Sequence, residues 1–224
     1  YFTKKITPNP SIEELSDKLF QLGHEHEINN NIFEFELTPN RGDCISLIGL
    51  YRDLRLFYNI DVKENIYMSD INSFSFEFSN NADESTEGIS FLKIEIDKIP
   101  SKYNDVIESY FVDLNLNKNN FFTDISNYIS YETGQPTHCY DSSKINEPIR
   151  LDFLDKDSKF DTLLGKVIDI KKNDLVFFDR FNEVINLAGV VGSNNTSCSK
   201  NTKSIIVECA HFDSELIMGK SVRY

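Results

Sequence analysis

The sequence predicts an α+β fold, with a small N-terminal helical domain followed by a larger, strand-rich domain of mixed α/β structure. Two observations lead to this prediction. Apolar side chains recur at helical spacing in the first 60 residues, whereas short alternating apolar runs separated by polar turns dominate the second half. The length of 224 residues allows one large or two modest domains. We expect the domains to cover residues 1–65 and 66–224.

The N-terminal domain is expected to contain two helices and one strand. Ser11 stands three residues before Glu14, which is the spacing of a capping box, and an apolar stripe at helical spacing follows. Alternation over residues 33–37 predicts a half-buried strand. A second helix is predicted over residues 45–58, with Asp43 as its N-cap.

The larger domain is expected to consist mainly of strands. A helix is predicted over residues 102–112, and Asp213 is a candidate cap for a short final helix. Residues 62–73 are expected to form a linker, and residues 180–183 have the composition of a hairpin loop. The predicted strands are 74–78, 91–96, 150–154, 166–170, 175–179, 184–188 and 204–210.

A helix with an abrupt stop is predicted in the middle of the chain. Apolar spacing predicts the helix over residues 126–132. Gly134 suits the left-handed conformation in which many helices end, and Pro136 prevents the helix from resuming. The next polar side chain with catalytic chemistry is His138.

Ser126, Asn127 and His138 form the first candidate site. We expect the helix stop to hold the imidazole at a fixed distance from the other two side chains. A hydroxyl, an amide and an imidazole can together bind an ester and orient water, and a near-neutral pKa suits a general base. No G-x-S-x-G motif surrounds Ser126, which argues against a nucleophilic serine. The alternative is an ordinary helix–turn with a satisfied structural histidine.

Two glycines and a glutamate form the second candidate site. Gly189 and Gly192 follow a predicted strand, where glycines let a ligand approach backbone N–H groups; a tight turn is the alternative. Glu208 shares a strand face with Ile206 and Ala210, so its carboxylate costs free energy unless a group hydrogen-bonds to it. If the fold supplies that partner, Glu208 is structural. If it does not, a ligand hydroxyl can satisfy the carboxylate.

Composition argues against several classes of protein. Lys and Arg total 23 against 36 Asp and Glu, a formal net charge of −13, so neither nonspecific nucleic-acid binding nor a DNA partner is expected. The four cysteines form no C-x₂-C pair, which predicts no metal site and reduced thiols in a cytosolic protein. No apolar run approaches the ~20 residues of a membrane span. The chain begins with Tyr1, and we expect it to be part of a longer protein.

Four sequence blocks, in the same order, resemble the β subunits of bacterial phenylalanyl-tRNA synthetases. The blocks are T-P-N-R-G-D-C-I-S at 38–46, S-N-Y-I-S-Y-E-T-G-Q-P-T-H at 126–138, L-A-G-V-V-G at 187–192 and I-V-E-C-A at 206–210. The resemblance implies that residues 66–224 are an editing domain, which hydrolyses tyrosine mischarged onto tRNA(Phe) by means of an activated water. It assigns the tyrosine hydroxyl to Glu208 and the Gly189 backbone.

The resemblance also implies partners and cofactors. The β subunit pairs with an α subunit in a cytoplasmic α2β2 heterotetramer, contacts the acceptor end of the tRNA, and leaves aminoacylation with ATP and magnesium to the α subunit. No cofactor is expected in this segment. Two departures stand out: the OB-fold tRNA-binding insertion expected near residues 29–31 is missing, and the sequence stops before a loop that completes the family's editing pocket. A non-catalytic module with a decayed editing site is therefore the alternative function.

Overall fold

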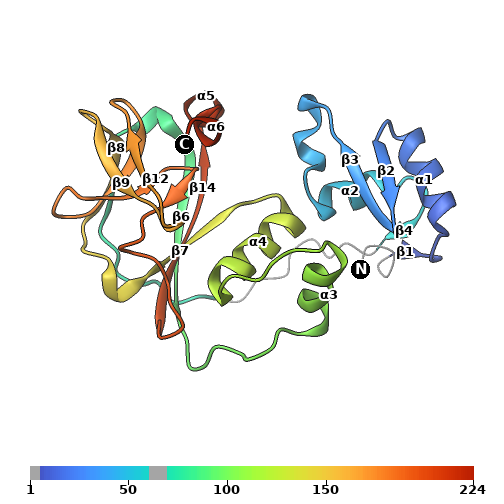
Figure 1. Cartoon of the computed structure of the whole chain (residues 1–224), viewed down its shortest axis with the longest axis horizontal. Coiled ribbons are helices and arrows are strands. Elements are labelled where there is room, and N and C mark those ends of the chain that lie inside the picture. Colours follow the sequence, from blue (N-terminus) through green and yellow to red (C-terminus); the bar gives the residue numbers. More distant parts are fainter. Residues whose placement is uncertain (1–5, 61–69) are drawn as a thin grey trace. The chain divides into compact units, whose positions relative to one another are not determined.

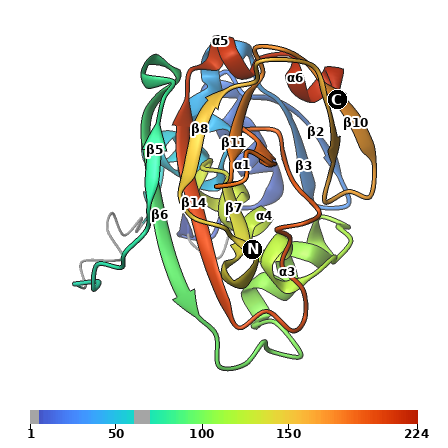
Figure 2. The same cartoon turned by 90° about the vertical axis from the view of Figure 1, so that its left-hand side faces the viewer.

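The computed structural model describes residues 6–60 and 70–224, and the chain divides into two compact units (Figures 1 and 2). Unit 1 comprises residues 1–71 and 100–136, and unit 2 comprises residues 72–99 and 137–224. The units therefore interleave along the chain, whereas the sequence predicted two consecutive domains that meet at residue 65. Most of the predicted linker lies outside the described residues.

Unit 1 combines helices with two small antiparallel sheets, β1–β4 and β2–β3. Its elements are β1 (Ile6–Thr7), α1 (Ile12–Gln21), β2 (Glu25–Asn29), β3 (Ile32–Glu36), the 3₁₀ helix η2 (Pro39–Cys44), α2 (Leu47–Leu54), β4 (Asn59–Ile60), α3 (Asp105–Asp113) and α4 (Phe121–Thr133).

The helix caps of unit 1 confirm one prediction and correct another. Ser11 caps α1 by accepting a hydrogen bond from the Glu14 N–H at 3.1 Å, as the capping-box spacing predicts. The predicted cap of the second helix is wrong. Asp43 lies in η2 with its carboxylate engaged by two arginines, and Ser46 caps α2 by accepting from the Gly49 N–H at 3.0 Å.

Helix α4 belongs to unit 1 because it packs on the N-terminal core. Tyr131 of α4 lies against that core. Gly134 ends α4 in the predicted left-handed conformation, with φ of 82°, and a Cβ there would come within 3.3 Å of Ser46, the cap of α2. The buried core residues are Ile6, Leu15, Leu19, Leu47, Tyr51, Leu54, Tyr58 and Ile60.

Unit 2 is built from two larger sheets and a hairpin. Its elements are β5 (Phe78–Asn80), the 3₁₀ helices η3 (Asp83–Ser85) and η4 (Ser142–Lys144), β6 (Thr86–Glu95), β7 (Thr137–Asp141), β8 (Ile149–Phe153), β9 (Ser158–Asp161), β10 (Val167–Ile170), β11 (Leu175–Phe178), β12 (Val184–Leu187), β13 (Val191–Gly192), β14 (Ser204–Phe212), α5 (Ser214–Ile217) and α6 (Lys220–Arg223). The five-stranded sheet has the order β13-β12-β11-β8-β5, and the three-stranded sheet has the order β6-β14-β7.

The two sheets of unit 2 share a core. Tyr140 and Ile206 from the three-stranded sheet pack in one buried cluster with Leu151 and Phe177 from the five-stranded sheet. Side chains that alternate toward this interior therefore meet across the two sheets. The polar residues among them form the candidate site.

Most predicted strands of unit 2 are confirmed, as β6, β8, β10, β11, β12 and β14, and the hairpin loop before β12 is also found. The strand predicted at 74–78 is wrong, because residues 70–77 carry no regular structure and β5 begins at Phe78. The sequence did not predict strands β1, β2, β4, β7, β9 and β13. The predicted helix at 102–112 is confirmed as α3, with Asn104 as its cap.

Candidate functional site

Strand β7 carries His138 into the interior of unit 2. After Gly134 and Pro136 the chain begins β7 at Thr137, and β7 pairs antiparallel with β14, with His138 opposite Glu208. The helix stop therefore delivers the histidine to a strand. His138 and Glu208, which the sequence placed in separate candidate sites, are brought together here.

Ser126 and Asn127 are placed on α4, in unit 1, whereas His138 belongs to unit 2. Their predicted grouping with His138 remains a prediction. The same division leaves the candidate site of unit 2 with His138, Glu208 and Gly192, together with two residues that the sequence did not single out.

Those two residues are Tyr140 and Asn186, which hold the Glu208 carboxylate. The Tyr140 hydroxyl donates to Glu208 Oε2, and Asn186 Nδ2 donates to the same oxygen at 3.3 Å. Asn186 Nδ2 also donates to the Tyr140 oxygen at 2.7 Å. The fold therefore supplies partners for one oxygen of Glu208, Oε2, and the role of this side chain toward a ligand remains a prediction. The sequence signal for Asn186 was present: an amide stands in the otherwise apolar run of β12.

Burial and hydrogen bonding have opposite effects on the pKa of Glu208. Glu208 is 5% exposed. Burial raises its pKa to about 7, although the hydrogen bonds donated by Tyr140 and Asn186 favour the ionised form and oppose this shift. The carboxylate consequently changes charge near neutral pH.

His138 presents an unpaired nitrogen to the interior. Its Nε2 is buried and has no hydrogen-bond partner among residues 6–60 and 70–224. The imidazole lies edge-on to the Tyr140 ring, with centroids 4.5 Å apart. Burial lowers the pKa of His138 to about 4, so the ring is neutral at physiological pH. A neutral imidazole with a free ring nitrogen can accept one hydrogen bond from a ligand or water, or donate one to it, depending on the tautomer.

Gly192 leaves the space that the imidazole fills. A Cβ at this position would lie 2.2 Å from His138 Cε1 and 2.4 Å from Nε2. Gly189 has a different role, because its φ of 69° forms the turn between β12 and β13 and its neighbouring side chain is Ile217. Gly189 therefore forms the tight turn that was the alternative interpretation from the sequence. A contact between the Gly189 backbone and a ligand remains a prediction.

Gly192→Ala should displace the imidazole and lower the free energy of unfolding by about 1–3 kcal/mol, the usual cost of overpacking. Chemical denaturation measures the stability, and the histidine side-chain resonances report the displacement. Gly88→Ala is the matched control, since a Cβ there meets no atom within 4 Å. Unchanged histidine resonances in Gly192→Ala would contradict the close contact.

Glu208→Gln should stabilise the chain more at pH 8 than at pH 5. Because the folded pKa of about 7 lies above the ordinary glutamate value of 4.5, the stability contributed by Glu208 is complete below pH 4.5 and is lost as the pH rises through 7. A shift of this size corresponds to about 3 kcal/mol, which the neutral amide avoids. Denaturation of both proteins across this range measures the difference. The exposed Glu215→Gln is the control, and a pH-independent difference would refute the burial effect.

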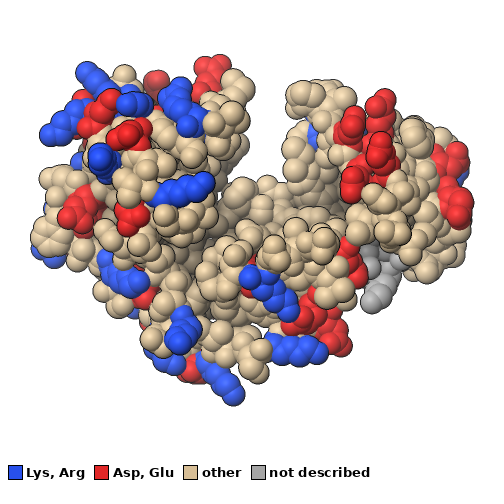
Figure 3. All heavy atoms as spheres, in the orientation of Figure 1, with Lys and Arg blue, Asp and Glu red and all other residues tan. Residues whose placement is uncertain are grey.

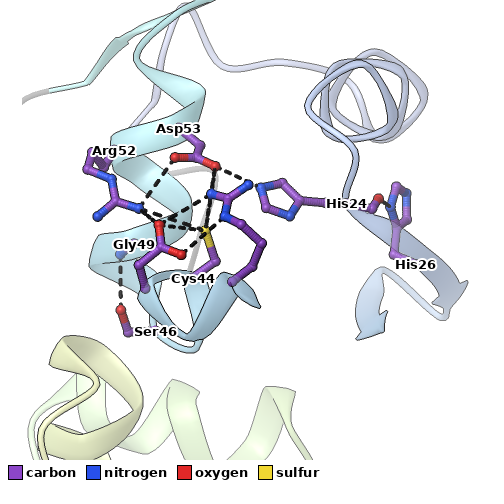
Figure 4. A network of polar contacts seen from close by, with 9 residues as sticks. His24, His26, Cys44, Ser46, Gly49, Arg52 and Asp53 are labelled. Carbon is purple, nitrogen blue, oxygen red and sulfur yellow. Dashed lines mark hydrogen bonds and ion pairs between the residues drawn. The ribbon is translucent and has the colours of Figure 1, made fainter. Parts of the chain in front are cut away.

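One cluster among the described residues has the composition of a metal site, and it lies in unit 1 (Figure 4). The ligand atoms of His24, Cys44 and Asp53 lie within 4.8 Å of one another. Arg41 donates to Asp53 Oδ2 and, at 2.7 Å, to Cys44 Sγ. Burial, followed by the nearby Asp53 carboxylate, raises the pKa of Cys44 to about 11, so the thiol is protonated. A guanidinium thus serves as the cation, and these residues fit a metal poorly.

Acidic side chains gather over the β2–β3 hairpin of unit 1 (Figure 3). Glu25 lies opposite Glu36, and Glu27 lies opposite Glu34, with all four exposed. Like charges directly opposite one another repel. This surface is unsuited to a phosphate backbone, in agreement with the net charge of −13.

Comparison with known proteins places these features in a family. The family model of the B3/4 domain matches residues 103–224. The phenylalanine–tRNA ligase β subunit of Fusobacterium nucleatum is 32% identical over 203 residues, which cover 87% of this chain and 25% of that protein. The β subunit of Ehrlichia ruminantium strain Gardel is 27% identical over 221 residues, covering 94% of this chain and 27% of that protein.

The chain spans about a quarter of the length of these relatives. Among solved structures, an N-terminal fragment of the phenylalanyl-tRNA synthetase β subunit from Pyrococcus horikoshii matches with a TM-score of 0.49 and 14% identity, covering 96% of this chain and 67% of that chain. Among the helices of the described residues, none has the length and apolar character to cross a membrane.

Proposed function

The chain belongs to the B3/4 domain family, and from this premise we propose that it is the editing segment of a phenylalanine–tRNA ligase β subunit, hydrolysing tyrosyl-tRNA(Phe) by an activated water. The observation that carries the proposal is the buried, unpaired Nε2 of His138 opposite Glu208. Buried polar atoms are nearly always paired, so an orphan atom points to a ligand or water that completes it.

The chemistry of the two amino acids explains why such a site is needed. Phenylalanine and tyrosine differ by one hydroxyl, and a hydrophobic synthetic pocket cannot strongly reject a near-isostere that adds a hydroxyl. A second site that hydrogen-bonds the hydroxyl discriminates far better, because phenylalanine leaves its polar groups unpaired. Glu208 is the acceptor in this proposal, and His138 positions or deprotonates the water. The Gly189 backbone contributes to the hydroxyl site in this proposal, and ester binding by Ser126 and Asn127 stays a prediction from the sequence.

The proposal includes partners. The segment acts within an α2β2 heterotetramer, receives the acceptor end of the tRNA, and works in the cytoplasm. Aminoacylation with ATP and magnesium belongs to the α subunit. Because the expected OB-fold insertion is missing and the surface is acidic, we expect other parts of the assembly to supply most phosphate contacts.

One observation favours a second candidate function, a non-catalytic module of the synthetase. The Glu208 carboxylate already accepts hydrogen bonds from Tyr140 and Asn186. In this alternative the polar cluster only fixes how the two sheets pack.

Deacylation by the complete β subunit with its α partner separates the two functions. The test compares release of tyrosine and of phenylalanine from charged tRNA(Phe). The proposal expects faster release of tyrosine than in buffer and little release of phenylalanine. If the enzyme charges phenylalanine normally but deacylates neither ester faster than the uncatalysed rate, the segment is a non-catalytic module.

A further inference from the structure

Both hydrogen bonds to the Glu208 side chain end on the same oxygen. Tyr140 and Asn186 donate to Oε2, and none of the described residues donates to Oε1. The three side chains are 3%, 3% and 5% exposed for Tyr140, Asn186 and Glu208 respectively. The carboxylate is therefore held by one oxygen, while the other keeps its full capacity to accept.

The donors come from both sheets of unit 2. Tyr140 lies on β7, beside Glu208 on β14, and the register that pairs Ile206 with Tyr140 fixes their separation. Asn186 reaches the same oxygen from β12 in the other sheet. Because Asn186 also donates to Tyr140, each donor fixes the position of the other. The orientation of the carboxylate is thus set by two buried side chains that also hydrogen-bond to each other.

We propose that Tyr140 and Asn186 are positioning residues that hold Glu208 by Oε2 and present Oε1 as the acceptor for the hydroxyl of a tyrosyl ester. This inference rests on the proposed editing function. It assigns tyrosine selectivity to three residues acting together, two of which never touch the substrate. A phenylalanyl group has no donor for Oε1, so it gains nothing from this arrangement.

The same two donors favour the ionised form of the carboxylate. Burial raises the pKa of Glu208, and both hydrogen bonds oppose the rise. The titratable groups around it are Tyr140 and His138 on β7 and Cys209 on β14, and His138 is neutral near pH 7 because burial lowers its pKa. Removal of one donor should therefore raise the pKa of Glu208 further.

The first test measures binding and does not depend on catalysis. Non-hydrolysable 3′-amide analogues of tyrosyl- and phenylalanyl-adenosine are titrated into the 224-residue chain and its variants by calorimetry. We expect Tyr140→Phe and Asn186→Leu each to reduce the preference for the tyrosyl analogue about tenfold, mainly by weakening that analogue. Tyr110→Phe is the control, since Tyr110 is a buried tyrosine of unit 1 that packs on other rings.

The second test follows the carboxylate itself. Carbon NMR of glutamate-labelled chain gives the titration midpoint of Glu208, assigned by its loss in Glu208→Gln. We expect a midpoint near 7 in the wild type and a higher one in Tyr140→Phe. A merely structural Tyr140 would lower affinity for both analogues equally, and that result would overturn the proposal. An unchanged midpoint in Tyr140→Phe would contradict the hydrogen bond on which the proposal rests.

Two further outcomes are decisive. A rise in tyrosyl preference in Tyr140→Phe would mean that Tyr140 competes with the ligand for Glu208, which overturns the positioning role. A wild-type chain with no tyrosyl preference would overturn both this inference and the specificity of the proposed function. A wild-type preference that survives in both variants overturns the inference alone.

Discussion

Replacement of His138 by alanine in the complete β subunit should slow hydrolysis of tyrosyl-tRNA(Phe) by about 10²–10⁴, the usual contribution of a general acid–base group. Phenylalanine charging should not change, because that chemistry is assigned to the α subunit. The loss is expected because His138 Nε2 is buried and has no hydrogen-bond partner among the described residues, so it is available to a water molecule. Single-turnover deacylation of the charged tRNA measures the loss.

The matched control is His211→Ala, on the same strand as Glu208 but largely exposed. It should leave deacylation unchanged. The pH profile adds an independent check: because burial lowers the pKa of His138 to about 4, the imidazole stays neutral well below pH 6.5. Protonation of His138 should therefore reduce wild-type activity only as the pH approaches 4, whereas a change near pH 7 is expected from Glu208. Equal rates for wild type and His138→Ala would return His138 to the structural interpretation.

Helix ends that depend on residues close in sequence were predicted correctly. Ser11 caps its helix through the Glu14 N–H, and Gly134 ends α4 in the left-handed conformation. The cap of α2 was predicted at Asp43 because an aspartate before an apolar stripe is a common N-cap. Arg41 and Arg52 take that carboxylate instead. Sequence spacing does not reveal that an arginine side chain will bind the carboxylate and prevent it from capping the helix.

The candidate site was only partly predictable for the same reason. A glutamate in an apolar strand demands a partner, and this demand was visible in the sequence at Glu208. The identity of the partners depends on the register of β7 against β14 and on how the two sheets meet. Because β7 itself was not predicted, Tyr140 was not placed on the interior face beside His138. Asn186 requires the packing of a second sheet.

Tertiary contacts, and not the order of segments along the chain, decide which residues form each compact unit. Residues 100–136 follow strand β6 of unit 2, yet they cluster with the first 71 residues. Tyr131 packs on the core of unit 1, and Gly134 approaches the cap of α2. Nothing in the composition of residues 100–136 distinguishes helices that cover one core from helices that cover another.

Asp53→Ala should destabilise unit 1 by about 1.5–3 kcal/mol, the usual contribution of a hydrogen bond to a charged group, because the side chains of Asp53 and Arg41 remain 16% and 30% exposed. Asp53 accepts from Arg41, and its Oδ2 lies 3.0 Å from His24 Nε2. Burial alone would raise the pKa of Asp53, but these hydrogen bonds outweigh it and lower the pKa. Without the carboxylate, the Arg41 guanidinium keeps only Asp43 as a charge partner among the described residues, and His24, only 2% exposed, loses its hydrogen bond.

Hydrogen exchange resolved by peptide is the suitable measurement, because two compact units need not unfold in one transition. Protection should fall in α1, α2 and β2 and remain unchanged in β8, β11 and β14. Asp17→Ala is the control, since the side chain of Asp17 is 66% exposed on α1. The same experiment separates the guanidinium from a metal ion as the cation of this cluster. With Arg41 in that role, a chelator leaves the protection of wild-type α2 unchanged, whereas a bound metal would make the chelator reproduce the Asp53→Ala pattern.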